Sequence, residues 1–171
     1  FKKIDSQIIL IGKTFGHLNQ SVFINELYNL HEGMPPEVNL LNEKNNGDII
    51  LKLINAGNIR SVHDVSAGGI ILALAEMSLS SNIGIKINKP KKLSNLFNYF
   101  FGEDQSRYLI EVDKNNYPKI EKILKDNNIY FDNIGVTQKE YFELDKVLKI
   151  SVKELYELNN RWYNNFNGLN S

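Results

Sequence analysis

Short apolar runs and amphipathic repeats alternate along this chain of 171 residues. Runs rich in β-branched and aromatic residues predict strands, at residues 7–12, 59–64, 83–87, 108–112, 130–136, 141–144 and 147–150. Apolar residues that recur every three or four positions predict helices, at residues 21–30, 42–56, 68–80, 93–101, 116–126 and 151–164. The mixture of βα units with a terminal hairpin predicts an α+β fold, with a mixed β-sheet flanked by helices.

Several of these elements carry signals for where they begin or end. Ser21 stands where a helix N-cap belongs, and Ser151 with Glu154 matches a capping box. Residues 34–37 predict an extended connector, because proline lacks a backbone donor and disfavours helical geometry before it. Asp145-Lys146 predicts a tight turn between the last two strands.

The length fits one domain with a true core. We expect residues 1–6 to be a linker from a preceding domain, residues 7–150 to form the domain, and residues 151–171 to be a C-terminal helix and tail. The chain opens at Phe1 without an initiator methionine, which indicates a fragment of something longer.

Composition excludes several classes of protein. Twenty basic and twenty acidic residues balance, so no general electrostatic hold on nucleic acid or on an anionic membrane is expected. The absence of Cys excludes disulfides and thiolate chemistry, and three His without Cys make a structural zinc site improbable. The longest apolar run, residues 70–74, is too short to cross a bilayer, and a cytoplasmic location follows by default.

Residues 61–69 (SVHDVSAGG) predict a strand that turns through two glycines into a helix. That geometry places backbone N–H groups and a helix N-terminus at the edge of a sheet, where phosphate is favoured. The candidate phosphate ligands here are His63, Asp64, Ser66, Gly68 and Gly69. The alternative is structural: Asp64 or Ser66 caps the helix, the glycines permit a tight turn, and His63 is buried beside Asp64.

Residues 101–109 (FGEDQSRYL) form a second polar cluster, between an aromatic run and an apolar strand. Glu103 and Asp104 are suited to a cation or a sugar hydroxyl, Gln105 to an amide, and Arg107 to a phosphate. The alternative is a solvated acidic turn in which Arg107 pairs with a carboxylate. Because four polar groups are costly to bury without partners, we expect them to line an exposed groove.

Together, these two segments resemble the C-terminal domain of formylglycinamidine ribonucleotide synthetase, also called phosphoribosylformylglycinamidine synthase. That family shows stretches similar to HDVS-x-GG-x-x-x-ALAEM and LFGEDQ-x-RYLVEV, which residues 63–77 and 101–112 match. Residues 9–14 (ILIGKT) and 33–36 (GMPP) also resemble family segments. The resemblance covers about residues 7–112.

The chain departs from the family pattern at two places. Ala67 stands where the family usually has Asp or Glu, so any role for that carboxylate is absent. Asn19-Gln20-Ser21 replaces a Gly-Gly-Ser or Gly-Gln-Ser loop, and asparagine tolerates positive φ better than most residues. The resemblance adds Ser21 to the candidate phosphate ligands.

The resemblance implies a mixed sheet with partial ferredoxin-like topology, as in the C-terminal domain of aminoimidazole ribonucleotide synthetase. It also implies a reaction in which ATP, Mg²⁺ and glutamine-derived ammonia convert an amide into an amidine. Most nucleotide and metal ligands would lie in N-terminal-type domains of the same polypeptide. Glu103, Asp104, Gln105 and Arg107 would then belong to a substrate site or a non-catalytic pseudo-site. We assign no catalytic residue and no metal ligand to this chain.

A chain without Cys has no glutaminase nucleophile, so ammonia must come from elsewhere. The resemblance implies a separate glutaminase subunit, with a small accessory subunit. The isolated chain is expected to be inactive. Two alternatives stay open: a domain of another synthetase of the superfamily, for aminoimidazole ribonucleotide or selenophosphate, and a non-catalytic anion-binding domain.

Overall fold

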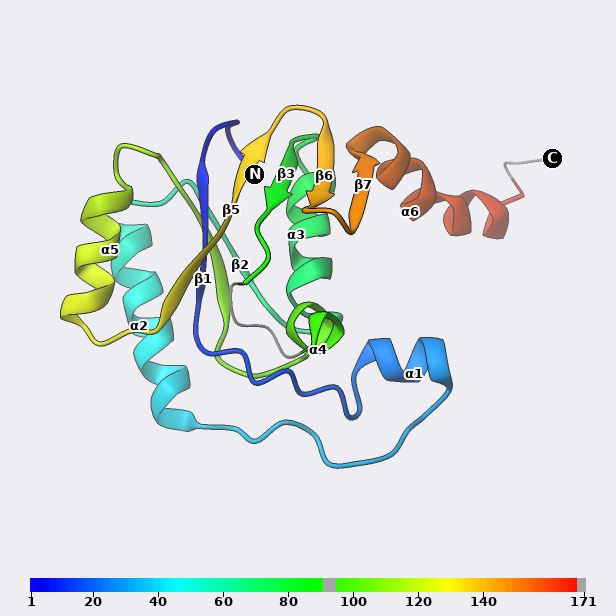
Figure 1. Cartoon of the computed structure of the whole chain (residues 1–171), viewed down its shortest axis with the longest axis horizontal. Coiled ribbons are helices and arrows are strands. Elements are labelled where there is room, and N and C mark those ends of the chain that lie inside the picture. Colours follow the sequence, from blue (N-terminus) through cyan, green and yellow to red (C-terminus); the bar gives the residue numbers. More distant parts are fainter. Residues whose placement is uncertain (91–94, 169–171) are drawn as a thin grey trace.

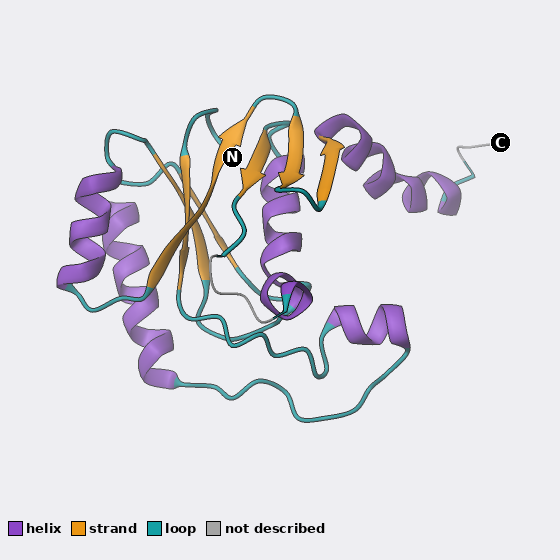
Figure 2. Ribbon diagram, in the orientation of Figure 1, coloured by secondary structure: helices purple, strands orange, loops and turns teal. Residues whose placement is uncertain are grey.

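The computed structural model describes residues 1–90 and 95–168, which form one seven-stranded mixed sheet with helices on both faces (Figures 1 and 2). The strands are β1 Gln7–Ile11, β2 Ser61–Asp64, β3 Gly84–Ile87, β4 Tyr108–Val112, β5 Phe131–Gln138, β6 Tyr141–Leu144 and β7 Leu148–Ser151. The helices are α1 Val22–Tyr28, α2 Leu40–Asn55, α3 Gly69–Leu79, α4 Leu96–Phe101, α5 Tyr117–Asp126 and α6 Val152–Phe166. The α+β class is confirmed.

Half of the sheet has the ferredoxin-like arrangement. The strand order is β2-β4-β1-β5-β3-β6-β7, and every neighbouring pair from β2 to β5 is antiparallel. The chain therefore runs β1-α2-β2 and then β4-α5-β5, which is the split βαβ pattern, with α3, β3 and α4 inserted between the two units. The ferredoxin-like topology is confirmed for this half only, since β3 pairs in parallel with β6.

Each face of the sheet carries its own apolar core. Ile9 and Ile11 of β1 pack with residues of α2 and α5, whereas Ile8 and Leu10 point to the other face and pack under α3. Because β1 is covered on both sides, its sequence is continuously apolar rather than alternating. Figure 1 shows α2 and α5 on one side of the sheet and α3 on the other.

Residues 1–6, expected to be a linker, pack against the domain. Phe1 is buried in the core beneath α3, and its amino group donates to the Met77 carbonyl at 2.7 Å. The N–H groups of Lys2 and Lys3 donate to the fully buried Glu111 carboxylate on β4. This buried carboxylate therefore holds the first residues onto the sheet.

The observed bounds differ from the expected ones mainly around α1 and α2. The side chain of Ser21 caps α1 as predicted, accepting from the N–H of Ile24, but α1 ends at Tyr28 because Asn29 takes a left-handed conformation. Helix α2 begins two residues earlier than predicted, because the Asn39 side chain accepts from the N–H of Asn42 and acts as the N-cap. A long connector, residues 29–39, joins the two helices along one end of the molecule (Figure 1).

The C-terminal elements follow the prediction closely. Strands β6 and β7 form the expected hairpin, but its turn includes Val147 as well as Asp145-Lys146, and Lys146 has a positive φ of 56°. The Ser151 hydroxyl accepts from the N–H of Glu154 and opens α6, which extends away from the sheet (Figure 1). Helix α4 begins at Leu96 behind the cap residue Asn95, and residues 93–94 of the predicted helix lie outside the described residues. None of the helices in the described part of the chain is long and apolar enough to cross a membrane.

Candidate functional site

Glu103 joins the two polar motifs. Its Oε1 accepts from the N–H of Gly68 at 2.7 Å and from the N–H of Val22 at 2.8 Å. Gly68 is the N-cap residue of α3 and Val22 is the first residue of α1, so one carboxylate oxygen serves the start of both helices. The negative charge favoured at this turn is therefore supplied by the protein itself, and the Gly68 N–H is engaged rather than free for phosphate.

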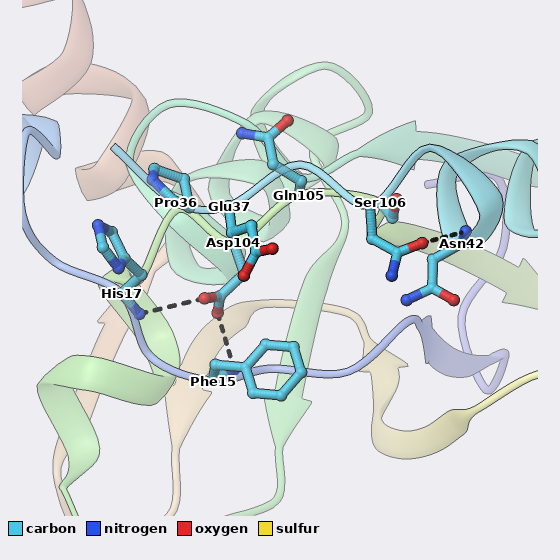
Figure 3. A pocket seen from close by; sticks show the side chains of 9 residues that line it. Phe15, His17, Pro36, Glu37, Asn42, Asp104, Gln105 and Ser106 are labelled. Atoms are coloured by element: carbon cyan, nitrogen blue, oxygen red, sulfur yellow. Dashed lines mark hydrogen bonds between the residues drawn. The ribbon is translucent and has the colours of Figure 1, made fainter. Parts of the chain in front are cut away.

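The Asp104 carboxylate accepts hydrogen bonds from three main-chain N–H groups in the loop after β1. Its Oδ2 accepts from the N–H groups of Phe15 and Gly16, and its Oδ1 accepts from the N–H of His17, at 2.9–3.2 Å. The side chain is almost completely buried, with the residue 4% exposed. Figure 3 shows this carboxylate hydrogen-bonded to the main chain of Phe15 and His17. Asp104 thus holds the loop that leads from β1 towards α1.

Arg107 lies beneath this loop and is only 2% exposed. Its guanidinium donates to the carbonyls of Asp104 and Gly102 and to the Thr14 hydroxyl. Burial lowers the pKa of Arg107, and the Asp104 carboxylate, 3.7 Å away, opposes that shift. The expectation that all four polar residues lie on an exposed surface is therefore wrong for Asp104 and Arg107. Main-chain N–H groups of the loop satisfy Asp104 inside the domain, and the Gly102 and Asp104 carbonyls with the Thr14 hydroxyl satisfy Arg107.

The turn between Asp104 and β4 is held against β1 and α2. Gly12, with φ of 92°, approaches so closely that a Cβ there would lie 2.4 Å from the Ser106 carbonyl oxygen. The Ser106 hydroxyl donates to the Glu43 carboxylate at 2.5 Å, and the Asn46 amide donates to the Ser106 carbonyl. These contacts fix the position of Gln105 at the crest of the turn.

The candidate phosphate ligands of the first motif, residues 61–69, do not converge on one site. The His63 ring lies 3.3 Å from the Glu76 carboxylate and 2.6 Å from the Asp64 carbonyl, and it is half-buried. Ser66 is exposed, and neither its side chain nor that of Asp64 caps α3, because Gly68 is the cap residue without a side-chain bond. In the described part of the chain no hydrogen bond or ion pair connects His63 with the second motif. His63 lies beside Asp64 as the structural alternative expected, with Nδ1 3.7 Å from the Asp64 carboxylate, but the ring is half-buried rather than buried and also contacts Glu76.

Gly69 and Ser21 have structural roles in this arrangement. A Cβ at Gly69 would lie 2.7 Å from the carbonyl oxygens of Phe100 and Gly102, so the glycine permits close packing of α3 on the end of α4. Ser21 is fully buried as the cap of α1. In the loop before it, the positive φ falls on Gln20 rather than on Asn19, and the Asn19 side chain lies against Gly33.

Gln105 separates two adjoining pockets, which we call together the Gln105 groove. One has a volume of about 330 Å³ and the other about 200 Å³, and both are lined by Phe15, Asn42, Gln105 and Ser106. The Gln105 side chain is exposed and forms no hydrogen bond with any described residue. Figure 3 shows it beside Pro36 and Glu37 of the connector, which line the larger pocket. An amide in this position is free to bind an external group.

Several groove residues were missed by sequence reasoning. Asn39, Asn42 and Asn45 stand at intervals of three along the start of α2 and so lie on one helix face, and all three line the groove. Lys13 lines the smaller pocket and lies 5.9 Å from the centre of the Tyr130 ring. The spacing of three between these asparagines is the signal in the sequence that points to them.

The groove supplies amide side chains, the exposed Glu37 carboxylate in the larger pocket and the Lys13 ammonium in the smaller one. Amide side chains both donate and accept hydrogen bonds, which suits sugar hydroxyls and amides, and Lys13 suits an anion. Among the residues that the structure describes, no three His, Asp or Glu side chains gather to hold a metal ion. The Gly68 N–H is engaged by Glu103.

Comparison with known proteins shows similarity over nearly the whole chain. A protein of Pelagibacter ubique (strain HTCC1062), named phosphoribosylformylglycinamidine synthase subunit PurL, is 44% identical over 165 residues, 96% of this chain and 23% of the relative. The protein of that name in Rhodopseudomonas palustris (strain HaA2) is 38% identical over 162 residues, 95% of this chain and 22% of the relative. The chain therefore spans less than a quarter of the length of these relatives.

Solved structures share the fold. Thermotoga maritima PurL complexed with FGAR superposes with a TM-score of 0.71 at 16% identity, over 91% of this chain and 28% of that one. T. maritima PurL complexed with ATP gives 0.69 at 15% identity, over 91% and 26%. A thiamine-monophosphate kinase from Stenotrophomonas maltophilia gives 0.55 at 13% identity, over 84% and 51%.

A family match defines the domain itself. Residues 4–145 match the family described as AIR synthase related protein, C-terminal domain, which takes in β1 to β6. The match includes both polar motifs and the Gln105 groove, and the resemblance noted from those motifs is confirmed. The chain belongs to the AIR synthase related protein, C-terminal domain, family.

Proposed function

We propose that this chain is one domain of the synthetase subunit of a phosphoribosylformylglycinamidine synthase. The observation that carries the proposal is its 44% identity, over 165 residues, with a relative of that name. The proposed reaction consumes ATP and ammonia and converts the amide of formylglycinamide ribonucleotide to an amidine. The amide oxygen is phosphorylated, and ammonia then displaces phosphate.

Within that reaction, we assign this domain a binding and positioning role. Gln105 is the residue of the second motif that is exposed to an external group, and it projects between two pockets lined by amides. The groove would bind the hydroxyl and amide groups of a phosphoribosyl amide or a nucleotide, as a substrate site or a pseudo-site. Glu103, Asp104 and Arg107 would act on that ligand indirectly, by holding the turn and the loop that shape the groove.

The nucleotide, the metal and the remaining chemistry belong to other parts of the proposed enzyme. ATP and Mg²⁺ would be held by N-terminal-type domains of the same polypeptide, since the described residues lack a metal-binding cluster. Ammonia would come from a glutaminase subunit, with a small accessory subunit, and the fold of this chain is shared by PurLQS from T. maritima. The cytoplasmic location expected from the sequence belongs to the same proposal.

The proposal is tested by the substrate requirement of the complete polypeptide. ADP production should depend on both formylglycinamide ribonucleotide and ammonia, and residues 1–171 expressed alone should give none. ADP production that instead required formylglycinamidine ribonucleotide or selenide would favour one of the related synthetases. Turnover by residues 1–171 alone would contradict the assignment of catalysis to other domains, once host enzyme is excluded.

A further inference from the structure

An exposed apolar surface runs along the connector and the helix ends beside it. Met34 is 77% exposed and Leu40 is 76% exposed, although both are large apolar residues. We call this set the connector surface, and its members are Leu27, Leu30, Met34, Val38, Leu40 and Leu41. Exposed apolar residues that are concentrated in one segment of a folded domain are candidates for an interaction site.

The same stretch has an unusual charge distribution. The chain as a whole balances its charges, but residues 14–42 contain no Lys or Arg and three Glu. Glu26, Glu32 and Glu37 are exposed, and none forms an ion pair with another described residue. A partner suited to this surface is therefore apolar at its centre and bordered by Lys or Arg.

The connector is attached to the domain by few contacts, and these contacts adjoin the groove. The His17 ring nitrogen lies 2.7 Å from the Met34 carbonyl, and the Gln20 amide donates to the carbonyls of His31 and Gly33. Pro36 and Glu37, two and three residues after Met34, line the larger pocket of the Gln105 groove (Figure 3). Whatever packs on the connector surface is thus positioned to shape one wall of that groove.

We infer that the connector surface is the docking site for the rest of the same polypeptide, which closes the Gln105 groove from the connector side. This inference rests on the proposed function, in which the chain is one domain of a longer synthetase. It commits to that occupant because the relatives extend far beyond the matched stretch, which is 23% of the Pelagibacter protein. Interfaces between domains of one chain are commonly of such mixed apolar and polar character.

Met34 itself provides the probe. The chain has two methionines, and Met77 is buried in the core, so the oxidation of Met34 reports on the connector surface. The complete polypeptide would be treated with dilute hydrogen peroxide, and the Met34 peptide followed by mass spectrometry, in the folded state and in urea. Docking should slow Met34 oxidation by about tenfold or more relative to urea, as for other protected sites. The Leu40→Glu/Leu41→Glu double variant should remove most of that protection.

Leu51→Met provides the matched control. Leu51 lies on α2 with Leu40, is 58% exposed, and is not part of the connector surface. Its methionine should oxidise in the folded polypeptide nearly as fast as in urea. Equal protection at both positions, or none at Met34, would overturn the inference. Protection that appeared only at high protein concentration would point to a second copy and would also overturn it.

The outcome is independent of catalysis, because oxidation is read without turnover. Protection of Met34 in a polypeptide that makes no amidine would support docking and count against the proposed function alone. Free oxidation of Met34 in an active synthetase would do the reverse. The wild-type measurement needs no substitution, so a folding defect in the double variant could not rescue the inference.

Discussion

Asp104 and its three main-chain donors show what a single carboxylate contributes to this domain. The Asp104→Ala variant would leave the N–H groups of Phe15, Gly16 and His17 without an acceptor and Arg107 buried without its ion pair. Removing one partner of a buried pair costs about 3–5 kcal/mol. We expect a loss in unfolding free energy of about that size, measured by urea denaturation. A loss below about 1 kcal/mol would show that the loop does not depend on Asp104.

At Gly12, the loss of stability caused by adding a side chain has two parts, a steric clash and a strained backbone. Gly12→Ala would place a methyl group 2.4 Å from the Ser106 carbonyl and would also strain a backbone with φ of 92°. Gly57 has φ of 62° with nothing within 4 Å of an added Cβ, so Gly57→Ala isolates the backbone cost. We expect about 1 kcal/mol for Gly57→Ala and about 3 kcal/mol or more for Gly12→Ala. Equal losses in the two variants would rule out the close approach.

Gln105 should behave in the opposite way to Asp104. Its side chain is exposed and forms no hydrogen bond with any residue described, so Gln105→Ala should leave the melting temperature of the domain nearly unchanged. In the complete enzyme the same substitution should raise the dissociation constant of substrate or nucleotide about fivefold. This corresponds to about 1 kcal/mol of binding free energy for one lost hydrogen bond. A lower melting temperature with unchanged ligand binding would reduce the motif to a structural turn.

At the scale of elements, Glu103 couples α1 to α3. Because one oxygen accepts from the first N–H groups of both helices, Glu103→Ala should loosen α1, which is seven residues long and has Phe23 as its buried residue. Amide exchange should accelerate in α1 and at Gly68, while α5, which has no contact with Glu103, serves as the control. Exchange that stays slow in α1 would show that aromatic packing of Phe23 against Phe101, with ring centres 4.5 Å apart, is sufficient.

The sequence predicted the ends of helices and strands where a local signal was strong. The prediction was wrong where several residues of one type could each have capped the helix. The Gly57 stop, the Ser151 cap and the Asp145-Lys146 turn lie where the sequence places them. Asn29 and Asn39 instead end one helix and begin the next, and an Asn-rich sequence offers many such positions without ranking them. Selection among them depends on the connector and its tertiary contacts, which local patterns do not contain.

At the scale of the whole molecule, sequence patterns predicted the class of fold and the two polar motifs, but not how burial divides them. Glu103, Asp104, Gln105 and Arg107 are adjacent and equally polar, yet Asp104 and Arg107 are buried and Gln105 is exposed. The difference arises because the β1–α1 loop, some ninety residues away in the sequence, presents its N–H groups to Asp104. Which residues of this turn are buried therefore depends on a contact between segments far apart in the sequence, and a periodic pattern of apolar residues does not contain that information.

If this domain serves an amidine-forming synthetase, as proposed, the product made by the complete polypeptide will carry nitrogen from ammonia. Incubation with ATP, formylglycinamide ribonucleotide and ¹⁵N-ammonium, followed by mass spectrometry, should give a ribonucleotide in which one ¹⁵N replaces the amide oxygen. The ¹⁵N product and ADP should form in equal amounts. ATP hydrolysis without incorporation of ¹⁵N, or consumption of formylglycinamidine ribonucleotide in place of the amide, would rule out the proposed amidine-forming reaction.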